Sequence, residues 1–199
     1  MTRNHILLVA ALAAITAIAC SGNNDDESPE PTGKLMVVTT ISPITSIVEN
    51  IGGTRIRVNG IVPEGVNSHT FEPAPSIAKI VSQADLIVLN GLFLEELFLE
   101  MATTNQRPGA IVLALGDKAV TKDEWVFDFS FPQSDGHPNP HLWTSPVLAL
   151  KYAELVRDQL VSLDPSNADY FNLNFDTFKQ RIDDLDGRIA VAVQTIPPE

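Results

Sequence analysis

The stretch LMVVTTISP, residues 35–43, joins an apolar run to the start of a helix. The run Leu35–Ile41 is rich in branched apolar residues and shows little alternation, which is typical of a strand covered on both faces. Ser42 is a good N-cap residue and Pro43 suits the first helical position, so we expect a helix to begin directly after the strand. A buried strand that runs into a helix is the repeating unit of a parallel sheet with helices on its faces.

Three more apolar runs of the same kind follow, and helical stretches separate them. The further strands are expected at Ile56–Val62, Asp85–Asn90 and Ala110–Leu115. The helices are expected from Ser42 to the stop signal Gly52-Gly53, over about 75–83, and from Leu92 to Ala102. This alternation predicts an α/β lobe built on a parallel sheet with flanking helices.

Two further helices are predicted near the end of the chain. Ser145 can cap the first, with Pro146 at its first position, and Asp164-Pro165 ends it. The second is expected to start with Ser166 as its cap and to run toward Thr195. Its apolar residues follow spacings of four and three and form a single seam: Phe171, Phe175, Phe178, Ile182, Leu185 and Ile189. Such a helix is longer than a lobe of this size needs.

The composition of the 199 residues limits the classes of function. Hydrophobic residues make up 44%, which is ordinary for a globular protein and enough to build one core. The formal net charge is -12, so the chain repels phosphate backbones and nucleic acid is not expected as a partner. The same charge favours the approach of cations.

The N-terminus carries a targeting signal. Arg3 is followed by the apolar run Ile6–Ala19, which is shorter than the roughly 20 residues that a membrane span needs and fits a secretory signal. The run ends in Ala-Ile-Ala-Cys-Ser, similar to a bacterial lipobox, which predicts lipid attachment at Cys20. The alternative is an ordinary signal peptide beside an incidental cysteine. Residues 21–33 are polar and acidic, as expected for a flexible tether.

Two histidines stand in proline-rich turns directly before predicted helices. His69 lies in GVNSHTFEPAPS, residues 65–76, and His141 lies in NPHLWTSP, residues 139–146. Imidazole is the commonest side-chain ligand of transition metals, and ligands of open α/β sheets bind outside the carboxyl ends of the strands. The two histidines are therefore candidate metal ligands, and the alternative is that both bond nearby backbone. Glu72 is interpreted as a carboxylate at the start of a helix rather than a ligand.

A long loop over residues 117–140 leads to His141. It contains a third histidine, His137, and the acidic residues Asp123, Glu124, Asp128 and Asp135. Loops of this length in compact domains are uncommon unless they are functional or mobile. We interpret these charges and His137 as solvated, with auxiliary metal capture as the alternative.

Taken in order, these segments resemble the metal-binding substrate-binding lipoproteins of zinc and manganese ABC transporters. The resemblance rests on His69 in a G-x-x-x-H-x-F-E-P-x-P-S segment, on ADL-x-x-x-NG at residues 84–91, and on His141 in N-P-H-x-W-x-x-P. It implies a two-lobed α/β protein with one long linking helix and a metal in the cleft. The expected organisation is a signal peptide at 1–19, an anchored tether at 20–33, an N-terminal metal-binding lobe at 34–165 and the linking helix at 166–196.

The resemblance also implies what the protein does. It predicts an extracytoplasmic solute-binding component that is anchored to the membrane, captures Zn²⁺ or Mn²⁺ and delivers it to the membrane permease of an ABC transporter. The alternative is a surface adhesin-like interaction lipoprotein. The sequence has no G-x-S-x-G elbow, glycine-rich phosphate loop or H-E-x-x-H pair, so an enzyme is not expected. The one enzymatic alternative is a metallohydrolase that uses His69 and His141 as metal ligands.

The sequence also departs from the family pattern. The family's second lobe, which supplies further metal ligands, is absent from these 199 residues. Two imidazoles fill only half of a tetrahedral zinc shell, so we expect this stretch alone to bind zinc or manganese weakly. We also expect the far end of the long helix, beyond Leu185, to be exposed.

Overall fold

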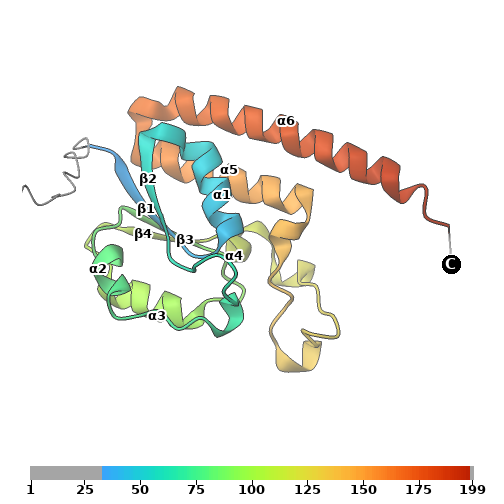
Figure 1. The fold of residues 1–199 in the computed structure, drawn as a ribbon, viewed down its shortest axis with the longest axis horizontal. Helices are drawn as coiled ribbons and strands as arrows, with labels where there is room; N and C mark the ends of the chain where they lie inside the picture. Colours follow the sequence, from blue (N-terminus) through green and yellow to red (C-terminus); the bar gives the residue numbers. More distant parts are fainter. Residues whose placement is uncertain (1–32, 198–199) are drawn as a thin grey trace, which may run out of the picture. The chain divides into compact units, whose positions relative to one another are not determined.

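The computed structural model describes residues 33–197, and the predicted signal peptide, Cys20 and most of the predicted tether lie outside that range. A four-stranded sheet forms the centre of the described part (Figure 1). All pairings are parallel and the strand order is β2-β1-β3-β4, as predicted for an α/β lobe. The strands are β1 (Leu35–Thr39), β2 (Ile56–Gly60), β3 (Leu86–Leu89) and β4 (Ile111–Ala114).

Helices cover both faces of the sheet, and successive residues of each strand point to opposite faces. Val37 and Val88 join the larger core, which packs against α1 (Ser42–Gly52), α5 (Pro146–Leu163) and the start of α6 (Ala168–Val193). Val38 and Ile87 join the smaller core beneath α2 (Ile77–Val81) and α3 (Glu96–Asn105). Burial on both faces explains why the central strand β3 is an unbroken apolar run, whereas the edge strand β2 is partly exposed and contains Arg57 and Asn59. A short helix, α4 (Leu115–Ala119), was not predicted.

Two of the three predicted helix caps, Ser42 and Ser166, are wrong. The N-cap of α1 is Ile41, with Ser42 already inside the helix. Ser145 is the N-cap of α5, but its side chain makes no capping hydrogen bond. Ser166 lies in a 3-10 turn before α6, and its hydroxyl donates to Asp164 Oδ1 at 2.5 Å. Pro146 is at the first position of α5 as predicted, whereas Pro43 is at the second position of α1, one later than predicted. Both prolines stay in a first helical turn, which their fixed φ suits.

The predicted helix Leu92–Ala102 begins four residues late. Leu92 and Phe93 have φ angles of 52° and 65°, in the left-handed region that a right-handed helix cannot include. Asp117 Oδ1 accepts a hydrogen bond from the Leu92 backbone at 3.2 Å, so a contact with α4 helps to hold this conformation. The helix α3 therefore spans Glu96–Asn105 instead.

The long helix α6 changes from buried to exposed along its length. Phe171 is fully buried and Phe175 is 8% exposed, whereas Leu185 is 37% and Val193 56% exposed. The exposure beyond Leu185 is as predicted, and Figure 1 shows this end of α6 extending away from the sheet. Within residues 33–197, no helix is long and apolar enough to cross a membrane.

Candidate metal centre

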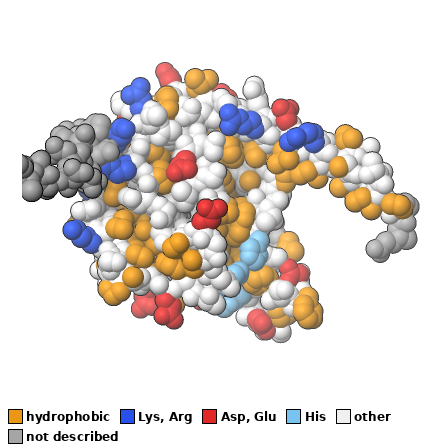
Figure 2. All heavy atoms as spheres, in the orientation of Figure 1, with side chains coloured by type: hydrophobic (Ala, Val, Ile, Leu, Met, Phe, Trp, Pro, Cys, Tyr) orange, Lys and Arg blue, Asp and Glu red, His pale blue; other side chains and the backbone are white. Residues whose placement is uncertain are grey.

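His69 lies in the connection that follows β2, inside a short 3-10 turn at Ser68–Thr70. The Asn67 side chain caps this turn, because its Oδ1 accepts a hydrogen bond from the His69 backbone N–H at 3.0 Å. Asparagine favours such local turns, in which its side chain replaces a backbone acceptor. The turn therefore fixes the backbone that carries the His69 ring. Figure 2 shows a patch of histidine side chains next to hydrophobic ones on the surface.

His141 reaches the same place from the long loop that follows α4. Its Nε2 lies 3.1 Å from Nε2 of His69, although the two residues are 72 positions apart in the chain. The ring centroids are 5.1 Å apart and the rings are tilted by 53°, so the two nitrogens face each other and the rings are not stacked. The structure thus brings together the two predicted ligands, and their role as ligands stays a prediction.

The electrostatic surroundings keep His141 neutral. Partial burial lowers the pKa of the His141 imidazole, and the neighbouring His69 lowers it further, while Asp128 acts in the opposite direction. A neutral imidazole keeps a lone pair on one nitrogen, which is the form that binds a metal. The lowered pKa of His141 therefore favours the protonation state that coordination by this residue requires.

Aromatic rings surround the two imidazoles. The ring of Phe131 lies 5.7 Å from that of His69 and 5.5 Å from that of His141, between centroids. Trp143 meets His141 edge-on at 5.1 Å. Such contacts limit the rotation of the imidazoles, although His69 itself is exposed to solvent.

Asn139 and Asp128 are the site residues that the sequence reasoning missed. Asn139 Oδ1 lies 2.7 Å from His141 Nδ1 and also accepts a hydrogen bond from the His141 backbone N–H at 2.9 Å. Asn139 Nδ2 donates to Asp128 Oδ2 at 2.5 Å. Asp128 is exposed, as expected for a solvated charge, but it also accepts this hydrogen bond, which the sequence did not predict. The one available signal for Asn139 was its place in the N-P-H segment.

A buried polar network holds the loop just before His141. Asn90, fully buried at the end of β3, donates from Nδ2 to the Pro140 carbonyl at 3.0 Å. The hydroxyl of Tyr152, also fully buried, donates to Asn90 Oδ1 at 2.9 Å. These bonds satisfy every polar atom of the Asn90 side chain and connect the sheet, α5 and the loop.

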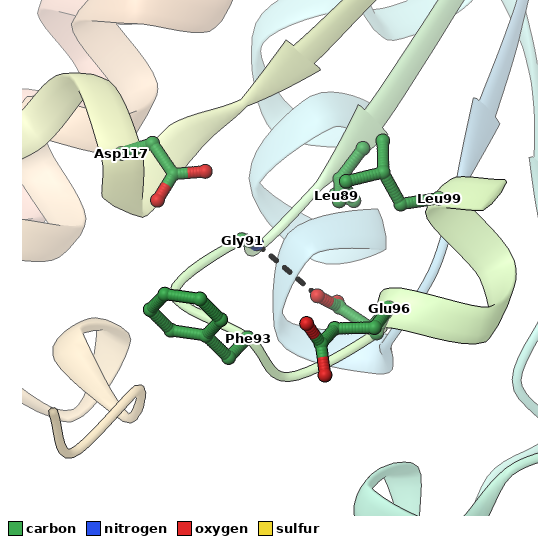
Figure 3. Close-up of a pocket in the computed structure, with 7 residues that line it drawn as sticks. Leu89, Gly91, Phe93, Glu96, Leu99 and Asp117 are labelled. Atoms are coloured by element: carbon green, nitrogen blue, oxygen red, sulfur yellow. Dashed lines mark hydrogen bonds between the residues drawn. The ribbon is translucent and has the colours of Figure 1, made fainter. Parts of the chain in front are cut away.

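Glu95 accepts hydrogen bonds from residues that follow the ends of β1 and β3. Its Oε1 accepts from the Thr40 hydroxyl at 2.7 Å and from the Asn90 backbone at 3.1 Å, and its Oε2 accepts from the Gly91 backbone at 3.1 Å. Burial raises the pKa of Glu95 more than these hydrogen bonds lower it. Figure 3 shows the bond to Gly91 at the edge of a cavity of about 260 Å³, with Phe93, Glu96 and Asp117 around it.

The other candidates lie apart from the pair. His137 is exposed and stacks on the ring of Phe93, at 4.2 Å between centroids and 9° between planes. Glu72 is exposed and lies five residues before α2, outside its first turn, so its interpretation as a helix-start carboxylate is wrong.

Glu124, interpreted from the sequence as a solvated charge, also closes a capping box with Thr121. No group of three or more histidine, cysteine, aspartate or glutamate residues with metal-site geometry occurs within residues 33–197.

Comparison with known proteins places the chain in a family. The model for "Zinc-uptake complex component A periplasmic" matches residues 37–199. The manganese-binding lipoprotein MntA of Halalkalibacterium halodurans is 32% identical over 96% of this chain and 60% of its own length. The manganese ABC transporter substrate-binding lipoprotein PsaA of Streptococcus anginosus is 33% identical over 100% of this chain and 64% of its own length. The chain thus spans less than two thirds of the length of these relatives.

Solved structures agree with this assignment. A cadmium-bound periplasmic metal-binding protein from Candidatus Liberibacter asiaticus superposes with a TM-score of 0.73 at 30% identity, covering 83% of this chain and 59% of the other. The periplasmic zinc-binding protein TroA of Treponema pallidum gives 0.74 at 26% identity, covering 83% and 57%. Since the family model covers most of the chain and the fold is shared, this chain belongs to the zinc-uptake complex component A family of periplasmic solute-binding proteins.

Proposed function

We propose that this chain captures a divalent transition metal, zinc or manganese, outside the cytoplasm and delivers it to the permease of an ABC transporter. The observation that carries the proposal is the 3.1 Å separation of the two Nε2 atoms. Two nitrogen ligands of a tetrahedral zinc, each at about 2.0–2.1 Å from the ion, lie about 3.3 Å apart. The pair therefore needs to open by only a few tenths of an ångström to hold one ion.

The charge and the relatives support the same function. The formal net charge of -12 favours the approach of cations. The names of the relatives describe manganese binding and metal transport, which favours metal capture over the adhesin alternative and over a hydrolase. Histidine ligands suit zinc and carboxylates suit manganese, so the two imidazoles alone favour zinc in this part of the protein.

The direct test is a calorimetric titration of the 199-residue chain with zinc and with manganese. A Cys20→Ala background keeps the thiol from contributing to zinc binding. We expect weak binding by the parent chain, because two imidazoles leave a tetrahedral ion half-coordinated. His69→Ala or His141→Ala should lower the zinc affinity by at least about 10- to 100-fold. Losses of this size already follow when a residue that only hydrogen-bonds to a metal ligand is mutated.

His137→Ala is the matched control for this test. It removes an imidazole from the same loop, but one that stacks on Phe93 rather than facing the pair. The control should bind zinc like the parent chain. Equal losses in all three variants would show that the paired histidines are not the ligands, and tight binding by the parent chain would show that other groups complete the shell.

We further propose that Cys20 carries the lipid that anchors the protein at the membrane surface. This residue follows the apolar run that ends in Ala17-Ile18-Ala19, and the relatives MntA and PsaA are named lipoproteins. Several acyl chains on one residue anchor a protein stably, whereas one alone holds it marginally. Cys20→Ala should therefore move the protein from the membrane fraction to the soluble fraction, while Ser21→Ala should not. A Cys20→Ala protein that stays with the membranes would contradict the anchor.

A further inference from the structure

Asp128 organises the loop that presents His141. Its Oδ1 accepts hydrogen bonds from the backbone N–H groups of Ser130 and Phe131, at 2.8 and 3.0 Å. Its Oδ2 accepts from Asn139 Nδ2 at 2.5 Å. The first two bonds fix the turn that places the Phe131 ring against both imidazoles, and the third reaches the residue that contacts His141.

The chemistry of these contacts determines which nitrogen of His141 carries its proton. An ionised carboxylate can only accept hydrogen bonds, so the Asn139 group that faces Asp128 must be the NH₂. The Asn139 carbonyl oxygen then faces His141, where it already accepts from the backbone N–H. An oxygen acceptor 2.7 Å from Nδ1 requires the proton on Nδ1. The lone pair of the neutral ring is left on Nε2, the atom that faces His69.

We propose that Asp128 and Asn139 are positioning residues that set the tautomer of His141 and so aim its Nε2 lone pair at the metal. The proposal rests on the proposed function for the identity of the ligand, but the tautomer itself is a property of the metal-free protein. In many metal sites a carboxylate bonds the histidine ligand directly. Here an amide stands between the two and passes on the orientation without placing a charge on the ring.

The variant Asp128→Asn tests this relay. To keep its bonds to the Ser130 and Phe131 backbones, the new amide must present oxygen to them and NH₂ to Asn139. Two NH₂ groups would then face each other, and Asn139 relieves this conflict by turning its amide over, which also breaks the hydrogen bond that its Oδ1 accepts from the His141 backbone N–H. His141 Nδ1 would now meet a donor, so its proton should move to Nε2. We expect zinc affinity to fall by about tenfold, as for other partners of ligating histidines.

The measurement is the ¹⁵N spectrum of the imidazole nitrogens in the full chain without metal, at pH 8, above the lowered pKa of His141. The parent chain should show His141 protonated on Nδ1, and Asp128→Asn should show it protonated on Nε2. Asp135→Asn is the matched control, because it removes one charge from the same loop and Asp135 Oδ1 accepts only from the Ser134 hydroxyl among the side-chain bonds of the described residues. It should leave the tautomer and the zinc affinity unchanged.

An exchange variant distinguishes orientation from loop stability. Asp128→Asn combined with Asn139→Asp restores a donor facing an acceptor and returns an oxygen to His141 Nδ1, with the net charge of the parent chain. It should restore the Nδ1 proton and the zinc affinity even if the single variant folds poorly. Retention of the Nδ1 proton in Asp128→Asn, or failure of the exchange variant to restore it, would overturn the proposal. A correct tautomer pattern in a chain that binds no zinc would instead overturn the proposed function.

Discussion

Replacing Glu95 with alanine is expected to lower the free energy of unfolding by about 3 kcal/mol. The carboxylate is 7% exposed and accepts from the Thr40 hydroxyl and from the backbones of Asn90 and Gly91. Removing it leaves these donors without their acceptor, and each buried donor without a partner lowers the free energy of unfolding by about 1–3 kcal/mol. Part of this loss is offset, because the carboxylate no longer has to be transferred from water into the protein interior. Urea unfolding followed by circular dichroism measures the loss. Glu96→Ala, at the exposed next residue, which begins α3, is the control and should change stability little.

The dependence of this loss on pH has a definite sign. Burial raises the pKa of Glu95 above its ordinary value of 4.5, so the folded state holds this proton to higher pH than the unfolded state. The contribution of Glu95 to stability is therefore fully present below 4.5 and declines as pH rises through the folded pKa. The difference in unfolding free energy between the parent chain and Glu95→Ala should be larger at low pH than at neutral pH. A difference that grows with pH would contradict the raised pKa.

Phe171→Ala is expected to cost about 3–5 kcal/mol, a large share of the roughly 5–15 kcal/mol that stabilises a typical domain. Phe171 is fully buried in the larger core, where the first turns of α6 pack against α1 and α5. Leu185→Ala on the same apolar seam is the matched control, because Leu185 is 37% exposed. It should cost no more than about 1 kcal/mol, close to the value for ordinary surface substitutions.

Urea unfolding of both variants separates the two ends of α6. Equal losses would mean that the exposed end of the seam contributes as much to the fold as the buried end. A small loss for Phe171→Ala would mean that α6 is not part of the core that covers the sheet.

The strands and the long helix could be predicted because their signals are local. Strands β1, β3 and β4 are mainly apolar runs, whereas the edge strand β2 contains the exposed Arg57. The structure keeps each strand within two residues of the predicted ends. The seam of α6 has a clear helical period. The start of α3 could not be predicted, because Leu92 and Phe93 favour a helix by composition but take left-handed angles where Asp117 binds the Leu92 backbone.

Some residues of the candidate site could likewise be predicted from the sequence, and others could not. His69 and His141 could be proposed from their turns and from the family resemblance, before any distance was known. Asp128 and Asn139 lie in a loop without periodicity, and their importance comes from contacts between residues 11 positions apart. The buried link from Asn90 to Pro140 spans 50 positions and has no local signal at all. Sequence patterns indicate which residues carry the chemistry, but not which side chains orient them.

The order of the strands also determines when the chain can fold as it leaves the ribosome. The central strand β1 bonds Asp85 across 49 positions, and α1 accepts a hydrogen bond from Asn174 of α6 across 123 positions. At about 5–20 residues per second, the ribosome takes on the order of 10 s to add the residues that complete this core. Until then β1 and α1 lack the partners that bury them, and such long-range pairing is intrinsically slow. A chain that stays open for this long remains available to chaperones and to the export machinery, which handle unfolded polypeptides.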